Sequence, residues 1–248
     1  MKYRKRSIIF VLALFILAVC TFAWRNLSSG TNTAQSVVFT ENTIRNINGY
    51  DCELWKDSGD AEMTPGESGT YTCTWHDTHN VVFRIGQKFK DLKPVSSFGT
   101  IKLAYGADYS PSGQSILGVY GWTKNPLVEF YISENWGEVR PNETFADANN
   151  QYEYIGTYTV DGAEYDVYTA LRENVPSING DCTTFIQYWS IRKTPSTQGT
   201  ITVSDHFRIW EEAGMPLGDI YEISFAVEGV MSSGSAHVYR NELTWEKQ

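Results

Sequence analysis

Leu-Val-Glu-Phe-Tyr-Ile-Ser, at residues 127–133, is the stretch that decides the fold. Successive side chains of a β-strand point to opposite faces, so Val128, Phe130 and Ile132 share one face and Glu129 and Tyr131 the other. The first face is apolar throughout and is typical of a core, whereas Glu129 points away from it. The stretch therefore predicts a strand with one buried face.

Residues 221–229, Tyr-Glu-Ile-Ser-Phe-Ala-Val-Glu-Gly, repeat this pattern and place Glu228 on the face opposite the apolar side chains. A glutamate that points off a sheet is most often simply solvated. Around Glu129, however, the same-face neighbour is Tyr131, and a Tyr-Gly-Trp run lies just upstream at residues 120–122. Two carboxyl groups on an aromatic, concave face are what glycoside hydrolysis requires.

The rest of the chain from Val37 onward is dominated by period-two patterns with closely spaced turn signals, which predicts an all-β protein. Asp161-Gly162 predicts a two-residue hairpin turn. One helix is expected, capped at its start by Ser204 or Asp205 and ended by Gly214. The strands expected are Asn80–Phe89, Thr100–Tyr105, Ser115–Trp122, Leu127–Glu134, Glu153–Val160, Tyr165–Arg172, Thr183–Arg192, Gly199–Val203 and Tyr221–Val230. We expect two twisted antiparallel sheets packed face to face, with a cleft on the concave face.

The N-terminus has four basic residues before an uncharged apolar run at residues 7–24, which is the order of a secretory signal peptide. If retained, that run is near the minimum length for a membrane anchor. Residues 25–39 are expected to be a flexible lead-in, and residues 40–248 a single catalytic domain. We expect a secreted protein, with a membrane-anchored form as the alternative.

Charge and cysteine content narrow the classes of partner. Lys+Arg 20 against Asp+Glu 29 gives a net charge of −9, and loss of four basic residues with the signal gives 16 − 29 = −13. Such a chain does not neutralise phosphates, which excludes nucleic acid as a partner. The sequence contains no cluster of Cys and His residues of the kind that binds a metal. Cys52 and Cys73 lie in strand-like stretches and could pair across a sheet in an exported protein.

Aromatic residues make up 14% of the chain. Indole and phenol rings can stack on sugar faces, which favours carbohydrate binding. The alternative is that Trp, Tyr and Thr are frequent because they suit strands.

Several ordered motifs together resemble glycoside hydrolase family 11, the endo-1,4-β-xylanases, over residues 40–246. They are residues 119–131 (VYGWTKNPLVEFY), 175–178 (VPSI), 187–192 (QYWSIR), 227–229 (VEG) and 232–236 (SSGSA). The resemblance implies a β-jelly roll of two twisted sheets. It also implies hydrolysis of internal β-1,4-xylosidic bonds of xylan by a retaining double displacement, with no cofactor.

The resemblance assigns roles to particular residues. It implies that Glu129 is the nucleophile and Glu228 the acid/base, and that a "thumb" loop, residues 175–178, covers the cleft. The residues it implies for substrate binding are Trp55, Asn80, Tyr120, Tyr131, Arg172, Pro176, Ser177 and Gln187. No metal ligand is expected.

The chain departs from the family pattern at three places. Ile116 stands where the family commonly has Tyr, and Val230 where it has an aromatic residue, so part of the usual aromatic lining is missing. Cys182 in the thumb is unusual.

The expected partners are xylan and xylo-oligosaccharides. We expect a monomer with no obligate protein partner. The alternative is a non-catalytic xylan-binding protein on the same sandwich, in which the glutamates only hydrogen-bond sugar hydroxyls. A purely structural sandwich would leave both off-core glutamates unexplained.

Overall fold

The computed structural model describes residues 37–144 and 152–247. The signal peptide expected at residues 1–24, and the lead-in as far as residue 36, lie outside the described residues. Phe39 is buried and exchanges backbone hydrogen bonds with Met63. The folded domain therefore includes residue 39, one position before the boundary expected at residue 40. Within the described ranges, no helix is both long enough and apolar enough to cross a membrane.

Strands account for most of the chain, and each predicted strand overlaps an observed one. The strands are β1 (Thr43–Ile47), β2 (Tyr50–Lys56), β3 (Asp60–Pro65), β4 (Tyr71–Pro94), β5 (Phe98–Lys124), β6 (Val128–Trp136), β7 (Tyr152–Val160), β8 (Ala163–Ser177), β9 (Gly180–Arg192), β10 (Gln198–Thr202) and β11 (Asp219–Lys247). The helices are α1 (Pro141–Thr144) and α2 (Val203–Glu212), with short 3₁₀ turns at Glu67–Gly69 and Val95–Ser97.

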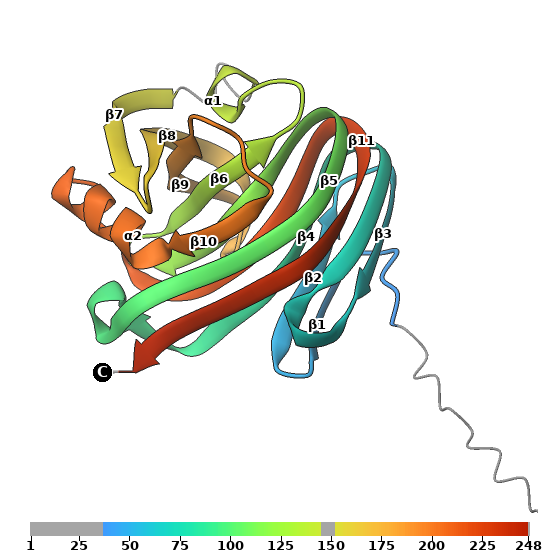
Figure 1. Cartoon of the computed structure of the whole chain (residues 1–248), viewed down its shortest axis with the longest axis horizontal. Helices are drawn as coiled ribbons and strands as arrows, with labels where there is room; N and C mark the ends of the chain where they lie inside the picture. The colour runs from blue at the N-terminus through green and yellow to red at the C-terminus, as the bar shows by residue number, and fades with distance from the viewer. Residues whose placement is uncertain (1–36, 145–151, 248) are drawn as a thin grey trace, which may run out of the picture. The chain divides into compact units, whose positions relative to one another are not determined.

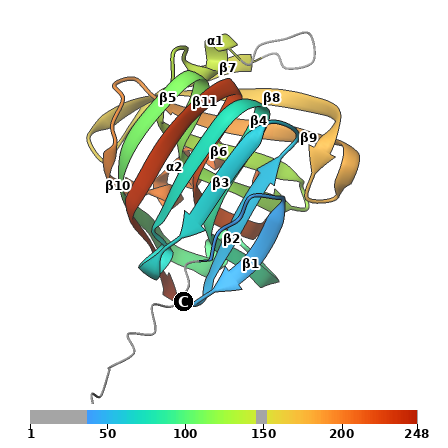
Figure 2. The ribbon, with the colours of Figure 1, turned by 90° about the vertical axis from the view of Figure 1, so that its right-hand side faces the viewer.

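Three long strands, β4, β5 and β11, bend and run through both layers of a curved sandwich (Figures 1 and 2). Each bend has a residue with positive φ: Asp77 in β4, Gly113 in β5 and Met231 in β11. At Gly113 the backbones are so close that a Cβ would lie 2.9 Å from the carbonyl oxygen of Met231, so glycine is required. The hydrogen-bonded order is β1-β2-β4-β11-β5-β6-β9-β8-β7, with β3 on β4 and β10 on β5.

The main core lies between the two layers, as the alternation predicts. Val128, Phe130 and Ile132 of β6 are fully buried there, together with Phe225 and Val227 of β11. A second cluster of buried side chains lies on the other face of the inner layer, the concave face: Ile116, Tyr120, Trp122, Tyr131, Phe185, Trp189, Ile191 and Ala226. The jelly-roll fold expected from the sequence is confirmed.

The predicted helix and hairpin are present, with one correction. Asp161 and Gly162 both have positive φ and form the turn between β7 and β8. Phe207 and Trp210 are buried on one face of α2, and Gly214 follows its end with φ 79°. The helix begins at Val203 and its N-cap position is Thr202, two residues before Ser204 and three before Asp205, so neither expected residue is the N-cap.

Two details of strand pairing lie beyond what alternation can indicate. β6 and β9 pair in parallel, within an otherwise antiparallel set of described strands. Cys52 lies opposite Ile85, and Cys73 lies opposite Met63 and Ala236, so the two thiols occupy different parts of the sheet. Both are buried and free, and the suggested Cys52–Cys73 disulfide is therefore wrong.

Candidate active site

Glu129 lies on β6 in the middle of the inner layer, pointing to the concave face as the sequence predicts. Trp122 of β5 is opposite it on one side and Gln187 of β9 on the other. Glu129 is only 7% exposed. A carboxylate buried to this extent must be held by hydrogen-bond donors.

Three side chains hydrogen-bond Glu129. The Tyr120 hydroxyl donates to Oε1 over 2.8 Å, the Tyr131 hydroxyl to the same atom over 3.3 Å, and the Gln187 amide to Oε2 over 2.6 Å. Trp122 and Trp189 support these donors, because their indole N–H groups hydrogen-bond the Tyr120 hydroxyl and the Gln187 carbonyl. Both carboxylate oxygens are therefore fixed in position.

These contacts oppose the effect of burial on the charge of Glu129. Burial raises the pKa of Glu129 above its ordinary value, whereas the hydrogen bonds from Gln187 and Tyr120 and the charges of Arg172 and Arg84 lower it. The donor groups stabilise the ionised form, which is the form able to attack an electrophilic carbon.

Glu228 lies on β11, between Val82 of β4 and Ile116 of β5. It is 9% exposed, and its Oε2 atom is buried without a hydrogen-bond partner among the described residues. Burial and the nearby charge of Glu129 raise the pKa of Glu228 to about 8. Glu228 therefore keeps its proton at neutral pH, as a general acid must.

Tyr131 connects the two carboxyl groups. Its hydroxyl hydrogen-bonds Glu129 over 3.3 Å, and its interaction with Glu228 lowers the pKa of that residue. Its ring is stacked on Trp189, with centroids 3.9 Å apart and an interplanar angle of 3°. Tyr131 is thus held rigidly between the groups, on the floor of a narrow hollow that Tyr120, Ala226 and Glu228 also line.

Asn80 and Trp55 lie on the same side of the site as Glu228. Asn80 pairs with Val230, and because Val82 pairs with Glu228, Asn80 is its diagonal neighbour on the same face. The Asn80 Oδ1 atom, like Glu228 Oε2, is buried without a partner among the described residues. Trp55 is half-buried on β2 opposite Val82, in the cross-strand row that contains Glu228.

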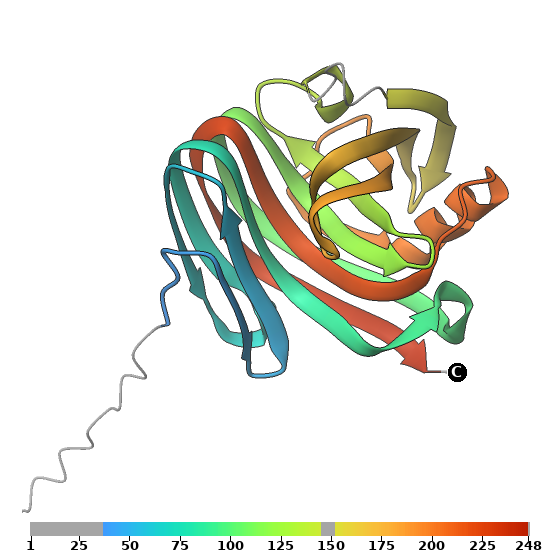
Figure 3. The same cartoon turned by 180° about the vertical axis from the view of Figure 1, so that it is seen from behind.

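Arg172 and the thumb lie on the hairpin of β8 and β9 (Figure 3). Arg172 is half-buried opposite Phe185, and its charge lowers the pKa of both glutamates. Pro176 is exposed at the tip, and Ser177 is tied into the turn by the Asn179 N–H. Neither contacts a carboxyl group in the described hydrogen bonds, although Ile178 packs against the concave cluster.

The sequence reasoning missed a buried group of four charges on the concave face, which we call the ionic cluster: Glu53, Arg84, Lys88 and Glu222. Arg84 lies 2.8 Å from Glu53 and 2.9 Å from Glu222, and Lys88 contacts both carboxylates. The sequence did contain a sign of this cluster, because Arg84 and Lys88 alternate onto the same face of the strand as Asn80.

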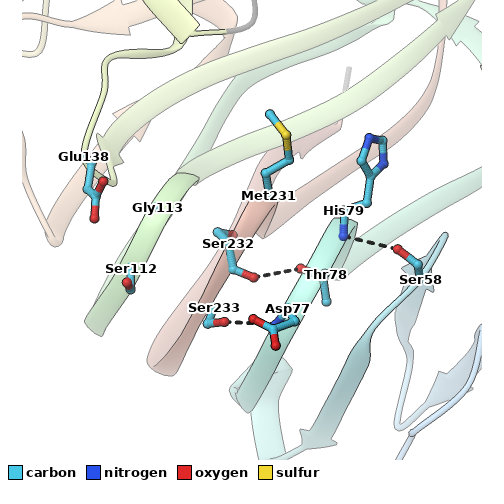
Figure 4. Close-up of a pocket in the computed structure, with 10 residues that line it drawn as sticks. All are labelled: Ser58, Asp77, Thr78, His79, Ser112, Gly113, Glu138, Met231, Ser232 and Ser233. Carbon is cyan, nitrogen blue, oxygen red and sulfur yellow. Dashed lines mark hydrogen bonds between the residues drawn. The ribbon is translucent and has the colours of Figure 1, made fainter.

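A depression of about 500 Å³ lies over β4, β5 and β11, and neither Glu129 nor Glu228 lines it (Figure 4). Thr78 and His79 of β4 and Met231 and Ser232 of β11 line it, and the His79 backbone N–H donates a hydrogen bond to the Ser58 hydroxyl oxygen over 3.3 Å. None of the predicted site residues lines this depression, which is rich in hydroxyl groups.

A jelly-roll sandwich with two buried carboxyl groups on its concave face, one held by three hydrogen-bond donors and one with a raised pKa, is typical of the glycoside hydrolases. The sequence model described as "Glycosyl hydrolases family 11" matches residues 47–239. The chain therefore belongs to glycosyl hydrolases family 11, and it is a glycoside hydrolase.

Individual relatives agree with this assignment. "Endo-1,4-beta-xylanase A" of Bacillus pumilus is 41% identical over 243 residues, which cover 98% of each chain. "Endo-1,4-beta-xylanase A" of Thermoclostridium stercorarium is 46% identical over 206 residues, 83% of this chain but only 30% of that protein's length. Among solved structures, the family 11 xylanase from Neocallimastix patriciarum has a TM-score of 0.75 and 33% identity, covering 85% of this chain and 100% of that chain.

Proposed function

We propose that this glycoside hydrolase is an endo-1,4-β-xylanase that cleaves internal β-1,4-xylosidic bonds of xylan with retention of configuration. The observation that carries the proposal is the contrast between two buried glutamates on one face. Glu129 is held by three donors, and the pKa of Glu228 is raised to about 8.

In the first step, the Glu129 carboxylate attacks the anomeric carbon while Glu228 donates its proton to the departing glycosidic oxygen. The C–O bond to the leaving sugar breaks, and a glycosyl ester forms on Glu129. Glu129 has then lost its negative charge, so the pKa of Glu228 falls and the ionised Glu228 becomes a base.

In the second step, Glu228 takes a proton from water, the water oxygen bonds to the anomeric carbon, and Glu129 leaves as a carboxylate. The Tyr120, Tyr131 and Gln187 donors favour this departure because they stabilise the returning charge. The two carboxyl groups supply all the acid, base and nucleophile that the reaction needs, so the proposal includes no cofactor.

Retention is supported by the position of Tyr131. Its side chain interacts with both Glu129 and Glu228, which places the two carboxyl groups close together. Retaining enzymes have about 5–5.5 Å between the carboxyl groups, whereas inverting enzymes need about 6.5–9.5 Å for a water molecule.

The remaining roles follow from position. We assign substrate contacts to Trp55, whose indole can stack on a xylose ring, to Arg172, and to the thumb residues Pro176 and Ser177. Residues 1–24 are proposed to export the chain, which acts outside the cell as a monomer on xylan and xylo-oligosaccharides.

Two measurements test the proposed function. Release of reducing ends from xylan separates an enzyme from a non-catalytic xylan-binding protein. The configuration of the first-formed sugar, followed by proton NMR, then tests the mechanism. A β-anomer is expected, and an α-anomer would show that Glu129 is a base and not a nucleophile.

A further inference from the structure

Arg84 packs against Tyr120, one of the three donors that hydrogen-bond the nucleophile Glu129, and the proposed mechanism gives Arg84 no role. Its guanidinium carbon lies 4.7 Å from the centre of the Tyr120 ring, within the range of a cation–π contact. The Tyr120 hydroxyl is the donor that lies 2.8 Å from Glu129. A path of two direct contacts therefore runs from Arg84 on β4, through Tyr120 on β5, to Glu129 on β6.

The guanidinium is fixed by both carboxylates of the ionic cluster. Arg84 Nη2 lies 2.8 Å from Glu53 on β2, and Nε lies 2.9 Å from Glu222 on β11. The Arg84 side chain is 8% exposed and that of Glu222 only 1%, so water screens these charges little. Ser224 donates a further hydrogen bond to Glu222 over 2.8 Å. Arg84 is thus held on two sides while its flat face covers the ring.

The other faces of the Tyr120 ring are also occupied. Tyr131 packs edge-on against it with centroids 5.1 Å apart, and the Trp122 indole N–H hydrogen-bonds its hydroxyl oxygen over 2.5 Å. A phenol held between a cation and an N–H donor is a stronger hydrogen-bond donor than a free one, because both withdraw electron density from its oxygen. Tyr120 has one described acceptor for its proton, Glu129 Oε1.

We propose that Arg84 is a positioning residue for the nucleophile, acting through Tyr120: it fixes the ring and strengthens the hydrogen bond that the hydroxyl donates to Glu129. The inference rests on the proposed function, because it takes Glu129 as the nucleophile. Arg84 itself touches neither carboxyl group of the catalytic pair in the described contacts.

A single Arg84→Met substitution would leave Glu222 buried without its main partner and could unfold the protein. The test therefore compares two double variants. Arg84→Met with Glu222→Gln removes one cation and one carboxylate and leaves the Lys88–Glu53 pair. Lys88→Met with Glu53→Gln removes the same charges and leaves the Arg84–Glu222 pair over Tyr120. Both keep the ionic cluster neutral.

The two variants should differ in the pH dependence of kcat/KM for xylo-oligosaccharides. The charged and titratable groups that face Arg84 are Glu53, Glu222, Lys88, Tyr120 and Tyr131, and those that face Glu129 are Tyr120, Tyr131, Arg172, Arg84 and Glu228. The second variant keeps the guanidinium over the Tyr120 ring, whereas the first removes it and with it a charge that lowers the pKa of Glu129. The acid limb of the first variant should move to higher pH by roughly 0.5–1 unit, and its kcat should fall about tenfold with KM changed less than twofold.

The Lys88→Met with Glu53→Gln variant keeps Arg84 paired with Glu222 and over the Tyr120 ring, and the amide oxygen introduced at position 53 can still accept a hydrogen bond from Arg84. Its kcat should therefore stay within twofold of wild type, about 0.4 kcal/mol by RT ln 2, with an unchanged acid limb. Equal changes in both double variants, or no change in either, would overturn the role of Arg84 while leaving the proposed function intact. A wild-type protein that does not hydrolyse xylan would contradict the proposed function and this inference with it. Thermal unfolding of all three proteins identifies any loss of fold.

Discussion

Gln187 and Glu129 face each other across the parallel pair of strands β9 and β6, and the Gln187 amide donates to Glu129 Oε2 over 2.6 Å. The two residues are 58 positions apart in the chain. This contact and the two tyrosine hydroxyls on Oε1 give one carboxylate three donors in a nearly dry environment. The three donors favour the ionised form of Glu129 and fix the orientation of its carboxylate.

Replacement of Glu129 by Gln should abolish turnover and preserve binding. The amide keeps the shape and most of the hydrogen bonds but cannot attack the anomeric carbon, so kcat should fall by more than about 10⁴-fold. Calorimetric titration with xylohexaose should still show binding. Glu138→Gln is the matched control and should retain full activity, because Glu138 is exposed and lines the separate depression of Figure 4. Substantial turnover by Glu129→Gln would remove Glu129 from the mechanism.

Replacement of Glu228 by Gln should affect substrates according to their leaving groups. On xylan the loss of the general acid should cost about 10²–10⁴-fold in rate. An aryl xylobioside with an activated phenol needs little protonation, so its first step should be within about tenfold of wild type, measured as the burst of released phenol. Equal loss on both substrates would show that Glu228 is not the acid.

The pH profile of the wild-type enzyme should be bell-shaped with a near-neutral optimum. Activity requires ionised Glu129 and protonated Glu228, so kcat/KM rises as Glu129 loses its proton and falls as pH passes the Glu228 pKa of about 8. Initial rates on xylo-oligosaccharides from pH 3 to 10 measure both limbs. An alkaline limb that persisted in Glu228→Ala would assign that limb to another group.

Asn80→Asp should move the optimum toward acid. Asn80 Oδ1 and Glu228 Oε2 are both buried without described partners on neighbouring strands, so an Asp at this position would share a proton with Glu228. The coupled pair would carry its acid function at lower pH. Asn179→Asp, on an exposed turn, adds the same charge and should leave the profile unchanged. An unshifted optimum in a folded Asn80→Asp protein would show that Asn80 is not beside the acid/base.

His206 should make the fold sensitive to acid. It is buried on α2 against the rings of Tyr165 and Trp210, and burial lowers its pKa to about 3. Because its folded pKa is below its unfolded value, the unfolded chain binds more protons between about pH 6.5 and 3, and stability falls as pH falls through this range. The loss is on the order of 3–5 kcal/mol at most.

His206→Phe, which cannot titrate, should therefore unfold at a lower pH than wild type in a fluorescence-monitored acid titration. His237→Phe is the control, because the His237 side chain is more than half exposed. If both variants unfold at the wild-type pH, the acid sensitivity lies in other groups.

The sequence by itself determined which residues share a face. Alternation in residues 127–133 and 221–229 placed Glu129 and Glu228 away from the core, and the structure has them on the concave face. The Asp161-Gly162 turn and the buried face of α2 follow equally from local chemistry. Local patterns are sufficient here because the face of a strand depends only on its period of two.

Only the tertiary structure decided which strands are neighbours. Pairing of β2 with residues 81–86 of β4 separates Cys52 from Cys73, and the parallel β6–β9 pair puts Gln187 beside Glu129. The ionic cluster around Arg84 likewise joins three strands that are distant in the chain. Partner and register depend on long-range packing of whole sheets, which a period of two does not encode. The pKa values of Glu129 and Glu228 depend on this packing too, because burial and neighbouring charge set them.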